Sequence, residues 1–256
     1  MSKRKQSGRT RSIIYGVHPV RETLAAGRRR VDEIYLVQGS ARDSDEALQL
    51  ANPSIHVKAV LGPDLTSLVG TPHHQGIAAR VGPFPYVGLD EILSRDPSHS
   101  RLVVVLDEVQ DPSNLGSILR SAECLGATAA VLAKDRSASV TPAVEKASSG
   151  ASAHLPVARV VNLVRSIEEL QRAGYWVFAA DPHGTDYCYD TDLSGDLALV
   201  LGSEEHGVRR LVRERCDGLI SIPMYGRIDS LNVSQTAAIL LSEVSRQRMR
   251  RTHRAD

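Results

Sequence analysis

Short apolar runs alternate with polar or amphipathic segments from residue 101 onward. The runs predict strands at residues 102–106, 129–133, 157–160, 176–180, 197–201 and 219–222. The segments between and after them predict helices at residues 114–125, 142–147, 163–173, 209–213 and 233–248. The run at 102–106 is apolar throughout, as is typical of a parallel strand covered on both faces. The alternation predicts an α/β fold with a mostly parallel sheet and helices on both faces.

Residues 12–81 form a shorter pattern of their own. Helices are predicted at 19–26, 44–51 and 63–68, and strands at 33–37, 55–59 and 76–81. The stretch GPFPYVG at 82–88 sets two prolines between glycines, which is typical of a linker, and the run at 89–93 begins a second domain. We therefore predict a basic tail (1–11), a small α/β domain (12–81), a linker with the start of the second domain (82–100), and a large domain (101–256).

The composition indicates that small and aliphatic side chains form the core. It also shows that charge is distributed unevenly along the chain. Hydrophobic residues make up 42% of the chain but aromatic residues only 4%, so Ala, Val, Leu and Ile must fill most of the core. The formal charge of +1 conceals three basic clusters: Lys3, Arg4, Lys5, Arg9 and Arg11; Arg28, Arg29 and Arg30; and Arg246, Arg248, Arg250, Arg251 and Arg254. Basic ends on a balanced body suggest contact with a polyanion. For each cluster alone, a solvated surface explains the charge equally well.

The cysteines and the hydropathy pattern exclude several classes of protein. Cys124, Cys188 and Cys216 are far apart and form no CxxC pair, so we expect neither a disulfide framework nor a metal site. Free cysteines fit a reducing compartment. No apolar stretch approaches the roughly 20 residues that cross a bilayer. The basic N-terminus lacks the apolar region of a secretory signal. The sequence therefore predicts a cytoplasmic protein without membrane or metal partners.

Three polar segments each follow a predicted strand of the large domain. The first begins DEVQDPSNLG at residue 107, the second is GSEEHG at 202–207, and the third is SLNVS at 230–234. Carboxyl ends of parallel strands meet at one edge of a sheet, which is where α/β proteins bind ligands. The first segment is not the G-x-G-x-x-G of an ordinary dinucleotide-binding domain. We therefore predict a site of another kind at this edge.

Several of these residues also have simpler structural explanations. Ser113 or Asn114 would cap the helix that follows, whose N-terminus also suits an anion, and Arg120 would lie on a neighbouring helical face as a surface residue. Two acidic residues, Glu204 and Glu205, would complement a helix dipole.

The second and third segments also point to a ligand. Gly202 would let a ligand approach the backbone, whereas His206 is expected to be an exposed loop residue. Ser230 or Asn232 would cap the last helix. Capping does not explain the apolar Leu231 between them, which favours a pocket for a partly apolar ligand.

Taken in order, NLGxxxR, GxExxG and SLNVS resemble motifs one to three of the SpoU (TrmH) branch of the SPOUT superfamily. These are knotted RNA methyltransferases that use S-adenosylmethionine. Two further stretches, YGVHPV at 15–20 and HQGI at 74–77, resemble the family's small substrate-binding domain, which is similar to a ribosomal protein. KASSGA at 146–151 resembles the subgroup that acts on a guanosine of bacterial 23S rRNA. Gln235, Thr236 and the long basic N-terminus depart from the family pattern, and they bear on the target RNA rather than on the chemistry.

The resemblance implies a C-terminal trefoil knot and a homodimer whose site borrows residues from the partner chain. It implies that the cofactor S-adenosylmethionine lies against five residues of the knot region: Ala180, Gly202, Ile222, Met224 and Leu231. It also implies five catalytic residues: Asn114, Arg120, Glu204, Ser230 and Asn232.

The implied reaction moves a methyl group to a ribose 2′-hydroxyl, and each residue has an expected role. An arginine stays protonated in proteins, so we expect Arg120 to clamp the target's phosphate and hydroxyl and to pass the proton to a phosphate oxygen. Asn114 would orient Arg120 or the ribose, and Glu204 would hold the loop. The remaining pair, Ser230 and Asn232, would hydrogen-bond the nucleotide or the cofactor carboxylate. Phosphate contacts are assigned to Arg9, Arg11, Arg28, Arg29 and Arg30.

The predicted function is thus ribose 2′-O-methylation of a guanosine in 23S rRNA or a large-subunit precursor. The first alternative keeps the chemistry and changes the substrate to tRNA. A second is a non-catalytic RNA-binding protein of ribosome assembly with the same fold. A third, a small-molecule α/β enzyme, leaves the basic ends unexplained.

Overall fold

A computed structural model of the chain describes residues 12–39, 48–95 and 100–252. The predicted tail and the first half of the predicted helix at 44–51 lie outside these residues. The chain divides into two compact units. The first unit combines Met1–Pro85 with Thr141–His154, and the second combines Tyr86–Val140 with Leu155–Asp256.

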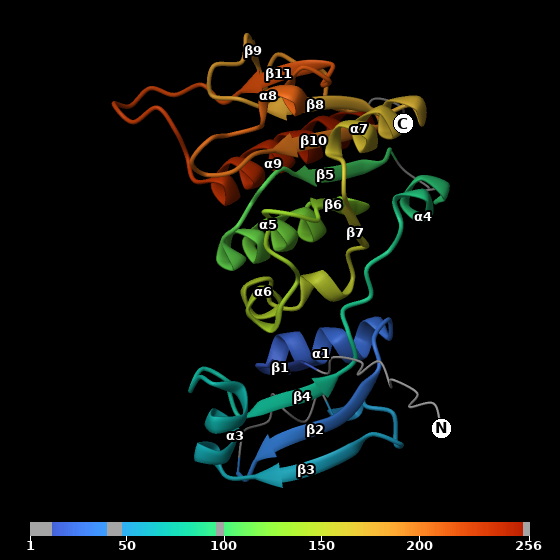
Figure 1. Cartoon of the computed structure of the whole chain (residues 1–256), viewed down its shortest axis with the longest axis vertical. Coiled ribbons are helices and arrows are strands. Elements are labelled where there is room, and N and C mark those ends of the chain that lie inside the picture. The colour runs from blue at the N-terminus through green and yellow to red at the C-terminus, as the bar shows by residue number, and fades with distance from the viewer. Residues whose placement is uncertain (1–11, 40–47, 96–99, 253–256) are drawn as a thin grey trace, which may run out of the picture. The chain divides into compact units, whose positions relative to one another are not determined.

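The first unit contains a four-stranded mixed sheet (Figure 1). Its strands are β1 (Ser12–Tyr15), β2 (Val31–Val37), β3 (His56–Val60) and β4 (Ile77–Val81), in the spatial order β1-β4-β2-β3. Strand β4 runs antiparallel to both β1 and β2, and β3 runs parallel to β2. The helices of this unit are α1 (Val17–Ala26), α3 (Gly62–Val69), α6 (Pro142–Ala147) and the short 3₁₀ helix η1 (Ala151–Ala153). Helices α6 and η1 thus reach this unit from the middle of the chain.

A buried ion pair holds α6 in the first unit. The guanidinium of Arg29, whose side chain is only 6% exposed, lies 2.7 Å from the carboxylate of Glu145. The same guanidinium donates hydrogen bonds to the carbonyl oxygen of Gly82 (2.7 Å) and to the hydroxyl of Ser12 (2.8 Å). Burial raises the pKa of Glu145, although the positive charge of Arg29 opposes the shift. Arg29 is therefore a structural residue that joins two distant stretches of chain.

The second unit contains a seven-stranded sheet in which every described pair is parallel. Its strands are β5 (Leu102–Leu106), β6 (Ala129–Ala133), β7 (Val157–Val160), β8 (Trp176–Ala180), β9 (Asp186–Tyr187), β10 (Leu197–Leu201) and β11 (Gly218–Ser221). Their spatial order is β7-β6-β5-β10-β8-β11-β9. Because all run in one direction, their carboxyl ends share one edge, as the sequence predicted.

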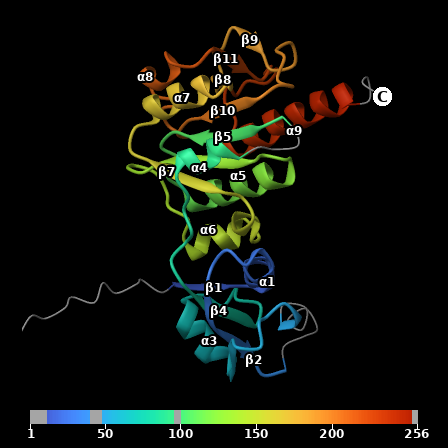
Figure 2. The same ribbon diagram turned by 90° about the vertical axis from the view of Figure 1, so that its right-hand side faces the viewer.

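Helices cover both faces of this sheet (Figure 2). On one face lie α4 (Leu89–Ser94), α7 (Leu163–Arg172) and α8 (Arg210–Arg213), which bury side chains against alternate residues of the strands. On the other face α5 (Pro112–Cys124) packs beside α9 (Val233–Thr252). Strand residues of both orientations are buried, for example Val103 and Val104 in β5. The predicted fold class, a mostly parallel α/β sheet covered on both faces, is confirmed.

Candidate active site

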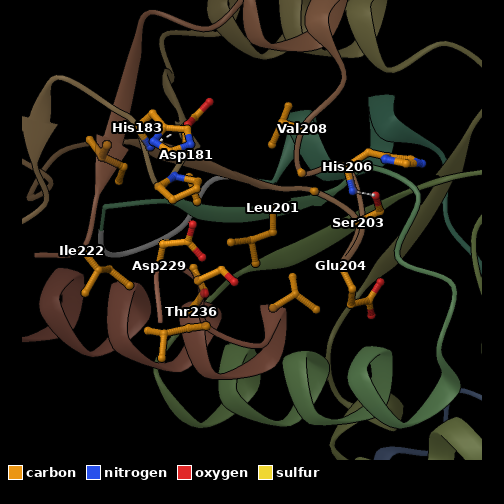
Figure 3. Close-up of a pocket in the computed structure, with 18 of the residues that line it drawn as sticks. Asp181, His183, Leu201, Ser203, Glu204, His206, Val208, Ile222, Asp229 and Thr236 are labelled. Carbon is orange, nitrogen blue, oxygen red and sulfur yellow. Dashed lines mark hydrogen bonds between the residues drawn. The ribbon is translucent and has the colours of Figure 1, made fainter. Parts of the chain in front are cut away.

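A cavity of about 390 Å³ lies at the carboxyl edge of the second unit's sheet. It opens where β8, β10 and β11 end, and its apolar wall includes Leu201, Ile220, Ile222, Val233 and Leu240. Figure 3 shows Asp181 and His183 on one side of the cavity, with Ser203, Glu204 and His206 on the other. The cavity combines an apolar wall with a polar rim, so it suits a ligand with both kinds of surface.

The loop after β10 folds back on itself at Gly202. The backbone N–H of Ser203 donates to the carbonyl of Gly207 (3.0 Å), and the N–H of Gly207 donates to the carbonyl of Ser203 (2.9 Å). A Cβ atom added to Gly202 would lie 1.9 Å from the carbonyl carbon of Gly207. Gly202 lines the cavity. The sequence suggested that a glycine stands here so that a ligand can approach the backbone, and this reason needs correction. The loop's own backbone, rather than a ligand, occupies the space that a side chain would need.

Asp107, a fully buried carboxylate, fixes the far end of this loop. Its oxygens accept hydrogen bonds from the backbone N–H (2.9 Å) and the guanidinium (2.8 Å) of Arg209. Burial alone would lower the pKa of Arg209, but the hydrogen bond and charge of Asp107 outweigh it and raise that pKa. Since Asp107 directly follows β5, it connects the first polar segment to the second.

Helix α5 begins at Pro112 rather than at the predicted residue 114. Asp111 caps it by accepting a hydrogen bond from the backbone N–H of Ser113 (2.7 Å). The predicted cap, Ser113 or Asn114, was therefore wrong, and the carboxylate of Asp111 already occupies the helix N-terminus that we considered for an anion. The side chain of Asn114 is left to bond elsewhere.

Asn114 connects the three predicted motifs through its amide group. Its Nδ2 donates to Oε1 of Glu204 (2.5 Å), and its Oδ1 accepts from Nδ2 of Asn232 (3.1 Å). Asn232 also caps α9, because its Oδ1 accepts from the backbone N–H (2.8 Å) and hydroxyl (2.6 Å) of Ser234. The chain Asn232–Asn114–Glu204 thus joins residues 118 and 90 positions apart in the sequence. Glu204 lines the cavity, so this chain lies at its rim.

The remaining predicted site residues separate into two groups. The cavity lining includes Ser230 and the five predicted cofactor contacts, Ala180, Gly202, Ile222, Met224 and Leu231. Arg120 instead lies exposed on α5 and is not among the residues that line the cavity.

Sequence reasoning missed Asp181 and His183, which line the cavity directly after β8. Asp181 forms a 2.7 Å ion pair with Arg213 and accepts a hydrogen bond from the backbone N–H of His183 (2.8 Å). Burial alone would raise the pKa of Asp181, but the hydrogen bonds from Arg213 and His183 lower it, so the carboxylate stays ionised at neutral pH. The sequence pattern could have identified them, because this polar pair follows an apolar strand, as the three motifs do.

Comparison with known proteins accounts for this arrangement. The model of the SpoU rRNA Methylase family matches residues 101–242, and the model described as RNA 2′-O ribose methyltransferase substrate binding matches residues 13–87. The chain belongs to the SpoU rRNA Methylase family. The predicted family membership is thereby confirmed. The trefoil knot stays a prediction.

Relatives of this SpoU protein cover nearly its whole length. The 23S rRNA (guanosine-2′-O-)-methyltransferase RlmB of Vibrio vulnificus is 39% identical over 93% of this chain and 97% of its own. A protein of Staphylococcus haemolyticus, assigned to the TrmH family of tRNA/rRNA methyltransferases, is 40% identical over 92% of this chain and 96% of its own. The SpoU methyltransferase AviRb of Streptomyces viridochromogenes, solved in complex with AdoMet, is 28% identical with a TM-score of 0.81 over 97% of this chain and 95% of its own.

The predicted RNA-contacting arginines of this SpoU protein have different surroundings. Arg9 and Arg11 lie outside the described residues. Arg29 must be removed from this group, because its buried guanidinium is held by Glu145. Arg28 donates to the carbonyl oxygen of His154 (3.2 Å), while Arg30 is 74% exposed and pairs with Asp32 (2.6 Å). Of the central cluster, Arg30 has the side chain most available to a phosphate.

Arg248, in the C-terminal basic cluster, also has a structural role. Its guanidinium donates to the carbonyl oxygens of Ser100 (2.8 Å), Arg101 (2.9 Å) and Gly195 (2.7 Å). Burial lowers the pKa of Arg248. This residue therefore anchors α9 and contributes little to an exposed basic surface.

The cavity has the chemistry that a nucleoside-based cofactor requires. Its apolar wall suits a purine ring, and Gly202 and Ile222 line it from the segments that follow β10 and β11. Within the described residues, no cluster of three or more His, Cys, Asp or Glu side chains could hold a metal ion. Across the same part of the chain, no helix is both long and apolar enough to cross a membrane.

Proposed function

We propose that this chain methylates the ribose 2′-hydroxyl of a guanosine in 23S rRNA or a large-subunit precursor, with S-adenosylmethionine as the methyl donor. Support comes from family membership and from relatives such as RlmB of Vibrio vulnificus, which is named for that reaction. One observation carries the proposal: the chain Asn232–Asn114–Glu204 brings three separate motifs to the rim of one cavity.

The cavity holds the cofactor in this proposal. The residues that would contact it are Ala180, Gly202, Ile222, Met224 and Leu231. S-adenosylmethionine, when bound, supplies a methyl group activated by its sulfonium. The walls of the cavity hold the cofactor and so fix the direction from which the ribose approaches, and such positioning is worth several kcal/mol of an activation barrier.

The rim residues position the ribose and manage its proton. A ribose hydroxyl is a weak acid, so its proton must leave as its oxygen gains the methyl group. Asn114, held between Glu204 and Asn232, orients the sugar, and Ser230 and Asn232 hydrogen-bond the nucleotide. The guanidinium of Arg120 clamps the adjacent phosphate, and the proton passes to an oxygen of that phosphate.

A homodimer would bring Arg120 into the site. In a single chain Arg120 is exposed on α5 and does not line the cavity. In the proposed dimer, Arg120 of one copy completes the cavity of the other. This arrangement fits a symmetric dimer, in which each copy gives and receives the same residue.

The test of this function replaces Asn114 by aspartate. Asn114→Asp exchanges the amide donor for a second carboxylate beside Glu204, and we expect turnover on large-subunit rRNA to fall about 100-fold because the positioning chain breaks. Cofactor affinity, measured by calorimetry, should change little. The control is Glu91→Gln, which alters an exposed carboxylate on α4 that does not line the cavity.

The target RNA is identified by mapping 2′-O-methyl positions in total RNA from cells with and without this protein. A missing mark on 23S rRNA supports the proposal, and a missing mark on tRNA favours the alternative substrate. Failure of the wild type to bind S-adenosylmethionine in the calorimeter would favour a non-catalytic RNA-binding protein.

A further inference from the structure

The loop between β11 and α9 combines residues that line the cavity with exposed residues that do not. Met224, Asp229 and Ser230 line the cavity. Between them Tyr225 and Ile228 are 96% and 72% exposed. In Figure 1 this red-orange loop extends beyond the ends of the strands. An almost fully exposed tyrosine therefore sits one peptide bond from a residue of the cavity wall.

Other exposed aromatic side chains of the second unit are less well placed. Trp176 is 62% exposed, but it begins β8, whereas Ala180 at the opposite end of that strand lines the cavity. Tyr187 and Tyr189 lie in and just after β9, and neither lines the cavity. Among the described residues, Tyr225 is the exposed aromatic that directly adjoins the cavity lining in the chain.

Recognition of a nucleotide at this cavity requires more than polar contacts. The rim residues Asn114, Glu204 and Asn232 offer amide and carboxylate groups suited to a ribose. The planar face of a nucleobase needs a different partner, and proteins that bind single-stranded RNA stack such bases on aromatic rings. Tyr225 supplies a ring, and Arg227 in the same exposed loop supplies a positive charge for the RNA backbone.

We infer that Tyr225 stacks on a nucleobase of the target RNA, either the methylated nucleotide or its neighbour, and so selects the conformation that presents the 2′-hydroxyl. This inference rests on the proposed function, which it deepens by assigning a substrate contact outside the three motifs. Stacking on a ring does not need the phenolic hydroxyl, so phenylalanine or tryptophan should replace Tyr225.

The test compares Tyr225→Ala, Tyr225→Phe and Tyr225→Trp in the full-length protein. We expect the alanine variant to raise the KM for RNA about 10- to 100-fold, which corresponds to about 1.4 to 2.8 kcal/mol. The affinity for S-adenosylmethionine should stay unchanged, and the two aromatic variants should match the wild type. Tyr189→Ala removes an equally large but differently placed exposed ring and serves as the control. A wild-type KM for RNA in Tyr225→Ala would overturn the inference.

A spectroscopic readout separates stacking from a structural role. RNA with 2-aminopurine beside the methylated nucleotide should lose fluorescence on binding to the wild type and keep it with Tyr225→Ala. Sedimentation should give the same oligomeric state for both proteins, and dissociation of the alanine variant would overturn the inference in favour of a contact between copies. An active wild type with an equally active Tyr225→Ala contradicts this inference alone, whereas a wild type that methylates no RNA contradicts the proposed function as well.

Discussion

Gly202 shows how a motif glycine can serve the protein's own backbone. The two ends of the 202–208 loop approach so closely that a single added carbon at Gly202 would overlap Gly207 and the amide nitrogen of Val208. The loop also carries Glu204, which bonds Asn114 at the cavity rim. The shape of the site therefore depends on a residue that contributes no side chain to it.

Replacing Gly202 by alanine tests this dependence. We expect Gly202→Ala to lower the free energy of unfolding by about 1–3 kcal/mol, because backbone must move to admit the Cβ. It should also weaken cofactor binding more than about tenfold, since the displaced loop lines the cavity. Urea denaturation and calorimetry measure the two effects. Gly195→Ala is the matched control, because no atom lies within 4 Å of its added Cβ. Equal effects of both substitutions would contradict this account.

Residue types alone selected several residues that the structure brings together at the cavity, but their hydrogen-bond partners were harder to predict. Asn114, Glu204 and Asn232 were selected from separate motifs, and the structure joins them by hydrogen bonds. Arg29 was misassigned because its partner, Glu145, is 116 residues away in the sequence. The cap of α5 was also wrong, since several residue types suited to capping stand close together before that helix.

At the scale of elements, an ion pair links the starts of two neighbouring strands of the large sheet, β5 and β10. Arg101 directly precedes β5, and Asp196 directly precedes β10. The carboxylate of Asp196 accepts from the backbone N–H of Arg101 (2.7 Å) and from its guanidinium (2.7 Å). Burial alone would raise the pKa of Asp196, but the hydrogen bonds and charge of Arg101 lower it.

The ion pair of Arg101 and Asp196 predicts a pH-dependent contribution to the free energy of unfolding. A carboxylate whose folded pKa is depressed stabilises the protein above its unfolded pKa, near 3.8, and loses that effect as the pH falls through the folded value. We expect Asp196→Asn to be about 1 kcal/mol less stable than the wild type at pH 7, allowing for partial exposure of the pair. The difference should shrink below about pH 4. Denaturation of both proteins across this range, with Asp135→Asn as an exposed control, gives the measurement; a constant difference would contradict it.

Most strands and helices followed from the hydrophobic pattern, but the strands β9 and β1 did not. The strands of the large sheet from β5 to β11, except β9, were predicted within one or two residues. Strand β9 has two residues, too few to show an alternating pattern, and β1 was missed although β7 and β11, which also have four residues, were predicted. Each forms because a neighbouring strand supplies backbone partners, β11 for β9 and β4 for β1. Such strands depend on tertiary context that local sequence does not contain.

At the scale of the whole molecule, the proposed dimer makes a prediction that a single chain does not. If Arg120 acts across the dimer, two inactive variants should restore each other. A mixed dimer of Arg120→Ala and Asn232→Ala has one complete site, formed by the cavity of the first copy and the arginine of the second. We expect about half the wild-type turnover per dimer, because one of two equivalent sites is intact. Coexpression with two different tags and tandem purification isolates this species, and an inactive mixed dimer would place Arg120 in its own chain's site.

The buried pair of Arg29 and Glu145 also bears on how the protein is made. The ribosome adds Arg29 to the chain well before it adds Glu145. At about 5–20 residues per second, the 116 residues that separate them take roughly 6 to 23 s to synthesise. During that interval the nascent N-terminal sheet carries a guanidinium whose final partner is missing. Because residues 141–154 belong to the first unit, that unit can be completed only after residues 86–140 of the second unit have been synthesised.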